Sequence, residues 1–279
     1  MLDKLNSNST FFCEQSIAED DDWLVEINGG IVDSDIFRTG MRVLRKRGHI
    51  LLAICLNNGY YKRRRIAKLI QVAASLSDQV TIFFTDGPAK HNYLALGQSE
   101  RQAIKQTRKQ YNQLKNACDE AILRVANDHT KFTFINWNDV YSRDDYIATY
   151  NDLALLYNSN QQFKSDVRDA TREVLRRTHS HSDIEAAVDV GIKYSLEELA
   201  LLAMYEDIAA GLPSPAPRDS DFAYIYYMRW EILEKLVSGI YDGRQRNHIG
   251  CVVLHVSEKQ SGAALSNTIS PQRCEHQAN

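Results

Sequence analysis

The sequence lacks the features that define several large classes of protein. No apolar run approaches the ~18–20 residues that a transmembrane helix needs. The polar N-terminal stretch MLDKLNSNST has no basic segment followed by an apolar one, so we expect no secretory signal and no membrane partner. The five cysteines are widely spaced and odd in number, which fits neither a disulfide framework nor a zinc motif. These absences favour a cytoplasmic protein with reduced thiols.

Signatures of nucleotide and metal binding are also missing. Neither G-x-G-x-x-G nor G-x-x-x-x-G-K-[ST] follows any expected strand, so the sequence predicts no dinucleotide site and no P-loop. His179 and His181 are close together in the sequence, but no third metal ligand is in view. We therefore expect no metal and no cofactor.

Charge is unevenly distributed in a chain whose composition is ordinary for a globular protein, with 44% hydrophobic and 25% charged residues. The net charge is −3, yet basic residues gather at Arg42–Arg47, at Lys62–Arg65 and at Arg101–Lys109. Local basic patches on a mildly acidic protein suit a polyanionic partner bound on one face. Solvated helix faces explain any single patch equally well, so both interpretations stay open.

The spacing of apolar residues predicts one α/β domain over residues 31–256. Apolar runs predict strands at 49–55, 80–85, 131–135, 222–227 and 250–256. Three- and four-residue spacing predicts helices at 35–47, 60–76, 98–126, 182–209 and about 230–236, with two or three more within 139–178. Strand, helix and strand over 49–85 form a right-handed unit, so we expect a parallel sheet of about five strands flanked by helices. We expect a flexible N-terminal extension at 1–30 and a disordered C-terminal tail at 257–279.

Cys55 follows the run of apolar residues that most resembles a central strand, Ile50–Ile54, and precedes the turn signal Asn57-Asn58-Gly59. Open α/β sheets bind ligands at the carboxyl ends of their strands. A helix N-terminus beside the thiol would favour its thiolate form. The alternative is that Cys55 is a small buried hydrophobic residue, which is the usual role of a free cysteine.

A second candidate feature is a tyrosine and a glutamate in the predicted helix 182–209. Tyr194 and Glu198 are four residues apart and therefore share one helix face. The carboxylate can hold an ammonium group and accept its proton, and the phenol can hydrogen-bond the same amine. The alternative is an apolar helix that carries both residues on a solvent-exposed edge.

Read together, three segments and one tyrosine resemble the cyclodipeptide synthase family. The segments are Ala53–Tyr61 (AICLNNGYY), Asp86–Gly97 with Ser99, Glu100 and Ala103, and Tyr194–Leu199 (YSLEEL); the tyrosine is Tyr226. The similarity runs from about residue 36 to residue 256. The resemblance implies a Rossmann-like fold similar to the catalytic domains of class I tyrosyl- and tryptophanyl-tRNA synthetases, without their ATP-binding motifs.

The resemblance also implies an activity and the residues that perform it. Cyclodipeptide synthases convert two aminoacyl-tRNAs into a 2,5-diketopiperazine by a ping-pong mechanism, through an aminoacyl-enzyme and a dipeptidyl-enzyme. Cys55 stands where the family has its nucleophilic serine, and Asn58, Tyr194, Glu198 and Tyr226 match its other catalytic positions. By position, the substrate-binding residues are Leu51, Ala53, Phe83, Thr85, Leu201, Tyr224 and Tyr227.

The implied partners are the acceptor arms of the two tRNAs. A basic ridge on the predicted helix 98–126 would contact them; it consists of Arg101, Lys105, Arg108 and Lys109. Lys62–Arg65 is a second candidate patch. Phosphate contacts of this kind carry no sequence specificity and weaken with salt. We expect a monomer that binds no DNA.

The sequence departs from the family at three places. Cys55 replaces serine, and a thiol suits the reaction because it is the more nucleophilic and more acidic group. Tyr227 stands where relatives have histidine or proline, and the proline-rich link at 211–217 is long. Two alternative functions therefore remain: a tRNA-binding protein that has lost acyl transfer, and a thiol-dependent aminoacyl-tRNA hydrolase.

Overall fold

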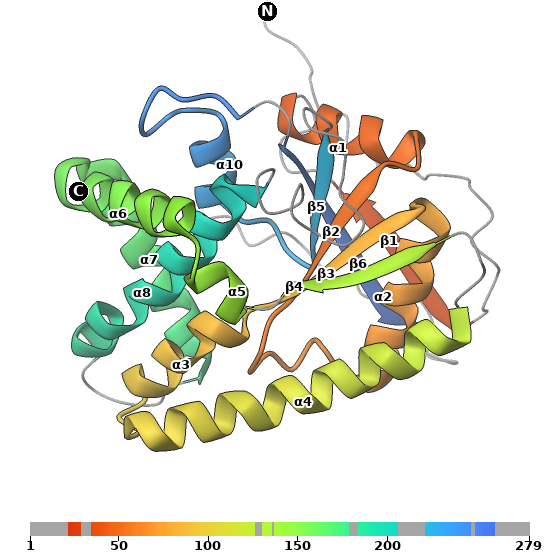
Figure 1. Cartoon of the computed structure of the whole chain (residues 1–279), viewed down its shortest axis with the longest axis horizontal. Coiled ribbons are helices and arrows are strands. Elements are labelled where there is room, and N and C mark those ends of the chain that lie inside the picture. Colours follow the sequence, from red (N-terminus) through yellow and green to blue (C-terminus); the bar gives the residue numbers. More distant parts are fainter. Residues whose placement is uncertain are drawn as a thin grey trace, which may run out of the picture.

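The computed structural model describes residues 22–28, 35–125, 130–135, 137–178, 184–205, 221–246 and 249–259. Strands and helices alternate along most of this chain (Figure 1). In chain order they are β1 Trp23–Asn28, α1 Asp35–Arg45, β2 His49–Ile54, α2 Arg63–Leu76, β3 Gln79–Phe84, α3 Asp86–Ala95, α4 Glu100–Val125, β4 Lys131–Ile135, α5 Trp137–Tyr141, α6 Asp144–Ser159, α7 Gln161–Thr178, α8 Ile184–Ala203, β5 Phe222–Tyr226, α10 Glu231–Val237 and β6 Ile249–Glu258.

The described strands form one mostly parallel sheet in the order β1-β6-β5-β2-β3-β4. β2 lies between β5 and β3 and is parallel to both, and all six of its residues are buried, as expected for a central strand covered on both faces. β4 pairs in parallel with β3 on one side, and β6 pairs in parallel with β5 on the other. The expected parallel α/β sheet flanked by helices is therefore confirmed.

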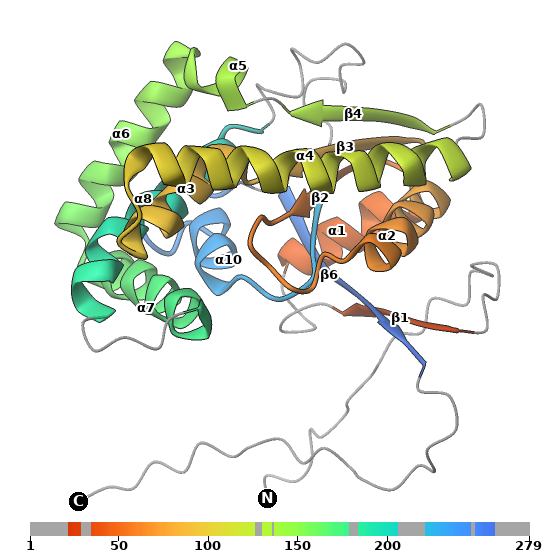
Figure 2. The ribbon, with the colours of Figure 1, turned by 90° about the horizontal axis from the view of Figure 1, so that it is seen from below.

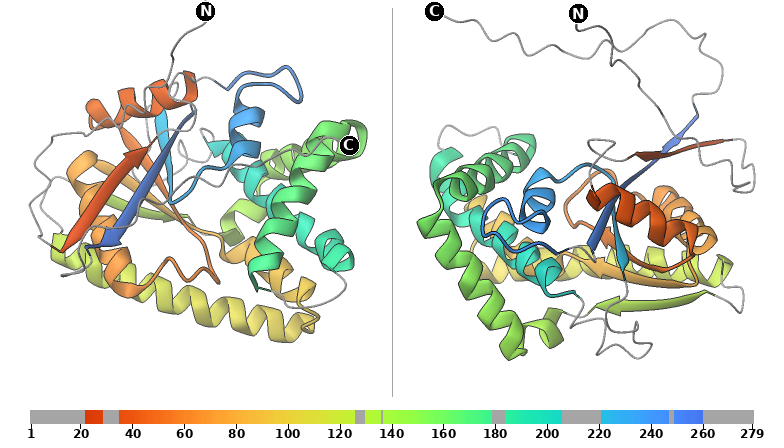
Figure 3. Two further views of the ribbon diagram at one scale, coloured as in Figure 1. Left: turned by 180° about the vertical axis from the view of Figure 1, so that it is seen from behind. Right: turned by 90° about the horizontal axis from the view of Figure 1, so that it is seen from above.

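The sheet separates two hydrophobic clusters. Ile50, Leu52 and Ile54 of β2 face the cluster that includes residues of α1, α2 and α4. Leu51 and Ala53 face the other cluster, which is formed with α5, α6, α7, α8 and α10. Figures 2 and 3 show this division: the second group of helices gathers on one side of the molecule, and the long α4 extends along both parts.

The structure corrects the expected sheet at its first edge. Residues 23–28, inside the range expected to be a flexible extension, form the strand β1, which pairs antiparallel with β6. The described sheet therefore has six strands, one of them antiparallel. β1 was missed because its partner, β6, lies more than two hundred residues away, although Trp23, Val25 and Ile27 alternate toward the core. The predicted tail beyond residue 259 lies outside the described residues.

The structure also contains a helix that the sequence did not predict: α3 begins at Asp86, directly before Gly87 and Pro88. Proline is compatible with the first turn of a helix, because the backbone N–H groups there have no partner within the helix. The expected helix 182–209 is described as α8 over Ile184–Ala203. The proline-rich segment 211–217 lies outside the described residues.

Candidate active site

Cys55 lies immediately after β2, in a loop held by local hydrogen bonds. The backbone N–H of Leu56 donates to Oγ1 of Thr85 at 3.2 Å, and the N–H of Tyr60 donates to Oδ1 of Asn58 at 2.9 Å. Asn57 has a φ of 58°, a left-handed conformation that asparagine tolerates better than most residues. Asn58 therefore shapes the turn that follows the thiol.

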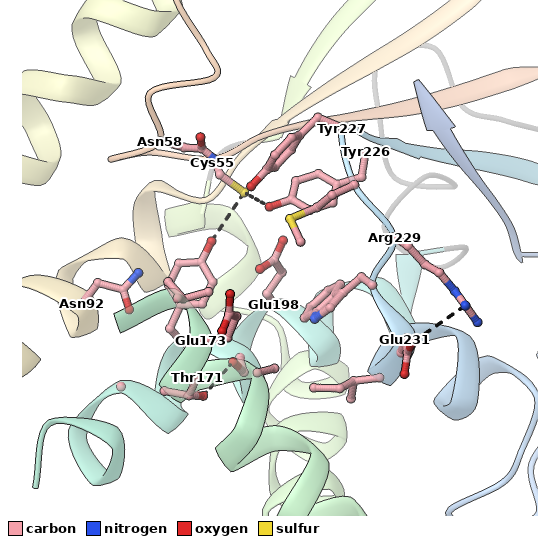
Figure 4. A pocket seen from close by; sticks show the side chains of 18 of the residues that line it. Cys55, Asn58, Asn92, Thr171, Glu173, Glu198, Tyr226, Tyr227, Arg229 and Glu231 are labelled. Atoms are coloured by element: carbon pink, nitrogen blue, oxygen red, sulfur yellow. Dashed lines mark hydrogen bonds and ion pairs between the residues drawn. The ribbon is translucent and has the colours of Figure 1, made fainter. Parts of the chain in front are cut away.

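Two tyrosine hydroxyls contact the thiol. The Tyr226 hydroxyl is 3.0 Å from Sγ of Cys55, and the Tyr194 hydroxyl donates to the same sulfur at 3.6 Å (Figure 4). The sheet explains the first contact, because β5 is parallel to β2 and both strands end at the same edge. The structure thus brings together side chains that are 139 and 171 residues apart in the sequence.

The thiol is protonated at neutral pH in this environment. Burial is the main cause that raises the pKa of Cys55 to about 12, and the nearby Glu198 carboxylate adds to the rise. The described helix that follows, α2, begins only at Arg63, so its N-terminus does not lie directly after the sulfur. The helix N-cap beside the thiol is Thr85 of α3, whose hydroxyl lowers the pKa of Cys55 by less than burial raises it. The expected helix-stabilised thiolate is therefore wrong, and Cys55 needs a proton acceptor before it can act as a nucleophile.

Glu198 is the carboxyl group nearest to this reaction centre and is almost completely buried, with 3% of its surface exposed. Burial raises its pKa from 4.5 to about 8, and the phenols of Tyr194 and Tyr224 act in the opposite direction. A carboxyl with a pKa near neutrality can both hold an ammonium group and accept its proton. The predicted grouping of Tyr194 and Glu198 on one face of α8 agrees with this arrangement.

A cavity of about 830 Å³ opens in front of Cys55. Its walls come from the loop after β2, from α3, α7 and α8, and from the segment between β5 and α10. In Figure 4, Glu198 and Glu173 approach from the side opposite Cys55, Tyr226 and Tyr227. The volume is within the range of about 300–1,000 Å³ that is usual for small-molecule sites.

The electrostatics of the cavity favour a cation over an anion. The charged residues that line it are the acidic Asp166, Asp169, Glu173, Glu198 and Glu231 and the basic Arg229 and Lys235. Arg229 binds Glu234 at 2.7 Å and Lys235 binds Asp166 at 2.8 Å, so both cations are paired. Among the acids, Asp169 pairs with Arg172, which does not line the cavity, and Glu231 lies 3.7 Å from Arg229, so the lining keeps more acidic than basic groups. The cavity therefore suits an amino group better than a phosphate.

The residues expected in the first substrate pocket lie below the thiol, between the sheet and α8. Leu51, Ala53, Phe83, Thr85, Leu201 and Tyr224 are all buried, at 2% exposure or less. None of them lines the 830 Å³ cavity, and Tyr224 lines a small cavity of about 20 Å³. Tyr227 instead lines the 830 Å³ cavity, and its ring stacks on Tyr60 at 4.6 Å.

The two predicted basic patches differ in their surroundings. Arg101, Lys105, Arg108 and Lys109 are exposed on α4 and form no ion pair with any other described residue. In the other patch, Arg63 pairs with Glu120, Arg64 pairs with Glu258 at 3.2 Å, and the Arg65 guanidinium covers the Tyr60 ring. The ridge on α4 is therefore the better candidate for binding a polyanion.

Sequence reasoning missed a buried polar cluster directly beside the site. Glu197, next to Glu198, accepts hydrogen bonds from the Tyr141 hydroxyl at 2.6 Å and from His91, whose Nε2 lies 2.9 Å from its carboxylate. These contacts outweigh the effect of burial and lower the pKa of Glu197. The consecutive glutamates were the available signal, because adjacent residues on a helix point in different directions.

Two further expectations concern metals and membranes. In the part of the chain that the structure describes, no three His, Cys, Asp or Glu side chains group as metal ligands, and no helix has the length and apolarity of a membrane span. His179 and His181 lie outside the described residues.

Comparisons with known proteins place these features in a wider group. A family model described as cyclodipeptide synthase matches residues 37–255. A curated relative, cyclo(L-leucyl-L-leucyl) synthase of Staphylococcus haemolyticus, is 21% identical over 76% of this chain and 89% of its own length.

Solved structures agree on the fold. A Mycobacterium tuberculosis structure, described as showing that cyclodipeptide synthetases are related to type I tRNA synthetases, superimposes with a TM-score of 0.62 at 16% identity, covering 84% of this chain and 93% of that one. A cyclodipeptide synthase of Candidatus Glomeribacter gigasporarum bound to Phe-tRNAPhe superimposes with a TM-score of 0.54 at 13% identity, covering 82% and 93%.

Proposed function

Because the chain belongs to the cyclodipeptide synthase family, enzymes that form peptide bonds from aminoacyl-tRNA, we propose that it makes a 2,5-diketopiperazine from two aminoacyl-tRNAs through acyl intermediates on Cys55. The observation that carries this proposal is the convergence of a thiol, two phenols and a carboxyl with a pKa of about 8 at one cavity. The acidic lining favours the amino end of an aminoacyl group and keeps the tRNA phosphates outside.

In the first step, Sγ of Cys55 attacks the ester carbonyl of one aminoacyl-tRNA. The C–O bond to the terminal ribose breaks, a thioester forms, and the ribose oxygen leaves with a proton. Tyr226 is placed to relay that proton, because its hydroxyl is 3.0 Å from the sulfur. It accepts the thiol proton while it donates its own to the leaving oxygen, so no free thiolate is required.

In the second step, the amine of the Cys55-bound aminoacyl group attacks the ester carbonyl of the second aminoacyl-tRNA. Glu198 holds that amine as its counter-ion and then takes its proton, and Tyr194 hydrogen-bonds the same group. The C–O bond to the ribose of the second tRNA breaks, the ribose oxygen leaves with the proton that Glu198 took, and a dipeptidyl thioester remains. Its new terminal amine attacks the thioester carbonyl, the C–S bond breaks, and the cyclic dipeptide and the free thiol are released.

The direct test is product analysis of the expressed protein. Bacteria that express the chain should release at least one cyclic dipeptide that control cultures lack, identified by mass spectrometry of the medium. Purified protein mixed with radiolabelled aminoacyl-tRNA should retain a hydroxylamine-labile adduct. tRNA binding with no adduct and no product would support the binding protein instead. Free amino acid with no cyclic product would support the hydrolase.

The ridge on α4 is the proposed contact for the tRNA acceptor arm. Substituting both Lys105 and Arg108 with alanine removes exposed charge while keeping good helix-forming residues. We expect weaker binding of aminoacyl-tRNA and a salt dependence whose slope falls by about one for each phosphate that the protein no longer neutralises. Filter binding over a range of KCl concentrations measures both.

The control is Lys131→Ala, which removes an exposed cation at the start of β4. Lys131 lies at the opposite end of the parallel strands from the thiol. Its affinity and salt slope should equal those of the wild type. Lys131→Ala removes one charge and the α4 double substitution removes two, so an effect half as large for Lys131→Ala would show that total charge matters and the ridge does not. We propose that the protein acts as a monomer, which light scattering of the active sample tests.

A further inference from the structure

Tyr224 is a buried phenol beside the reaction centre that the proposed mechanism does not use. It lies on β5 between Leu51 of β2 and Cys251 of β6. Its ring stacks with that of Tyr226 on the same face of the strand, so both rings point toward the side covered by α8. Only 2% of its surface is exposed.

The Tyr224 hydroxyl has no hydrogen-bond partner among the described residues. A buried polar group without a partner is unfavourable for folding, and it indicates a contact that forms in another state of the protein. Glu198 exerts the largest charge effect on the Tyr224 phenol. The phenol in turn lowers the pKa of Glu198, as a hydrogen-bond donor to the carboxylate does. The two groups therefore face each other, although their hydrogen bond does not reach full geometry in the resting structure.

The protonation state of Glu198 explains why this contact is incomplete at rest. A protonated carboxyl is itself a donor, whereas a carboxylate only accepts and can take two hydrogen bonds at once. Tyr194 donates to the Cys55 sulfur in the resting structure. Tyr194 also lowers the pKa of Glu198. When Glu198 carries a charge opposite the substrate amine, Tyr224 is therefore a second buried donor that can stabilise it.

We propose that Tyr224 is a positioning residue whose hydroxyl donates a hydrogen bond to the charged form of Glu198 and holds that carboxylate toward the amine bound above Cys55. This inference rests on the proposed function, since the amine is that of the aminoacyl substrate. Other groups that can titrate also surround Glu198: Cys55 after β2, Tyr61 in the following loop, Tyr194 on α8, Tyr226 on β5 and Glu173 on the same side of the cavity. Tyr224→Phe leaves all of these side chains in place and removes only the Tyr224 hydroxyl.

The alternative hydrogen-bond partner of the Tyr224 hydroxyl is a water molecule. A cavity of about 20 Å³ adjoins Tyr224 and Tyr226, which is room for one water molecule. A water that bonds only to the phenol would leave Glu198 unaffected by the loss of the hydroxyl. The titration of Glu198 therefore distinguishes the two.

The experiment is a pH titration of Glu198 by NMR in protein labelled with ¹³C at glutamate carboxyls, with the signal assigned by its absence in Glu198→Gln. In Tyr224→Phe the titration midpoint of Glu198 should rise by about one pH unit, because the charged form has lost a donor. The acid limb of the rate of cyclic dipeptide formation should move in the same direction, and the rate at neutral pH should fall about tenfold for the same reason. Replacing Tyr224 with 3-fluorotyrosine, a stronger donor, should lower the midpoint.

The control is Tyr205→Phe, which removes an equally buried hydroxyl that bonds Nε2 of His49 at 3.0 Å, at the other end of β2. It should lower thermal stability without moving the Glu198 midpoint. A midpoint unchanged in both Tyr224→Phe and the fluorotyrosine protein overturns the inference. The titration needs no turnover, so it remains decisive even if the wild type makes no cyclic dipeptide and the proposed function fails.

Discussion

Cys55→Ala should reduce cyclic dipeptide formation by at least about 10³-fold, because the variant has no atom that can carry the acyl group. The labelled adduct from aminoacyl-tRNA should disappear completely. Binding of tRNA should remain, since the α4 ridge is unchanged. Rapid-quench measurements with one equivalent of aminoacyl-tRNA test the adduct, and mass spectrometry tests the product.

Two further cysteine variants control this experiment. Cys118→Ala removes a fully buried thiol on α4 and should cost stability while leaving the labelled adduct intact. Cys55→Ser restores the family's usual nucleophile and should keep activity, but its adduct should resist hydroxylamine at neutral pH better than the thioester does. If Cys55→Ala makes as much product as the wild type, Cys55 is not the acyl carrier.

Glu198→Gln should separate activity from stability. The amide cannot accept the proton of the attacking amine, so we expect the rate of cyclic dipeptide formation to fall by about 10²–10⁴-fold. The labelled adduct on Cys55 should still form, because the first step uses Tyr226 as its relay. Accumulation of adduct without product is the kinetic sign of this block.

The same substitution should stabilise the folded protein at alkaline pH. Between about pH 4.5 and 8 the folded protein keeps a proton on Glu198 that the unfolded chain has released, so this group makes the free energy of unfolding fall as pH rises. Glutamine carries no charge and avoids that loss, which amounts to about 1.4 kcal/mol per pKa unit. Urea unfolding at pH 4, 6 and 9 should show no difference from wild type at pH 4 and the largest gain at pH 9.

Glu197→Gln is the matched control, with the opposite sign. The pKa of Glu197 is lowered on folding, so its carboxylate stabilises the protein above the unfolded value and loses that effect as pH falls. The substitution should therefore destabilise the protein at neutral pH, with a smaller effect in acid. A gain in stability from both substitutions at pH 9 would show that general charge reduction, and not the burial of Glu198, is responsible.

The elements of the fold that were predicted are those whose own residues show the pattern of a strand or a helix. β2, α2 and β3 have apolar runs and helical spacing that need no knowledge of distant residues. β1 was missed because its pairing with β6 is non-local, and α3 was missed because glycine and proline in a first helical turn have the same sequence signal as a loop. Apolar spacing alone would place Ile104 of α4 inside, yet it is 51% exposed, since α4 buries mainly small residues such as Ala103 and Ala121.

The candidate site was predicted from residue types at fixed spacings and from family resemblance. These identify Cys55, Tyr194, Glu198 and Tyr226, which the structure brings together. The protonation states were not accessible, because they depend on burial: the same fold raises the pKa of Glu198 and lowers that of Glu197. The side chains of the α4 ridge are exposed, so burial has little influence on their charge. Their contact with tRNA stays a prediction.

The contact between Cys55 and Tyr226 also sets an order of events during synthesis. β5 lies between β2 and β6 in the sheet, although 171 residues separate the thiol from the tyrosine. At 5–20 residues per second, a ribosome needs roughly 9 to 34 s to cover that distance. During this interval the thiol is exposed and easier to ionise than in the folded protein, because burial is what raises its pKa. The grouping of Cys55 with both tyrosines therefore forms only when the sheet is nearly complete.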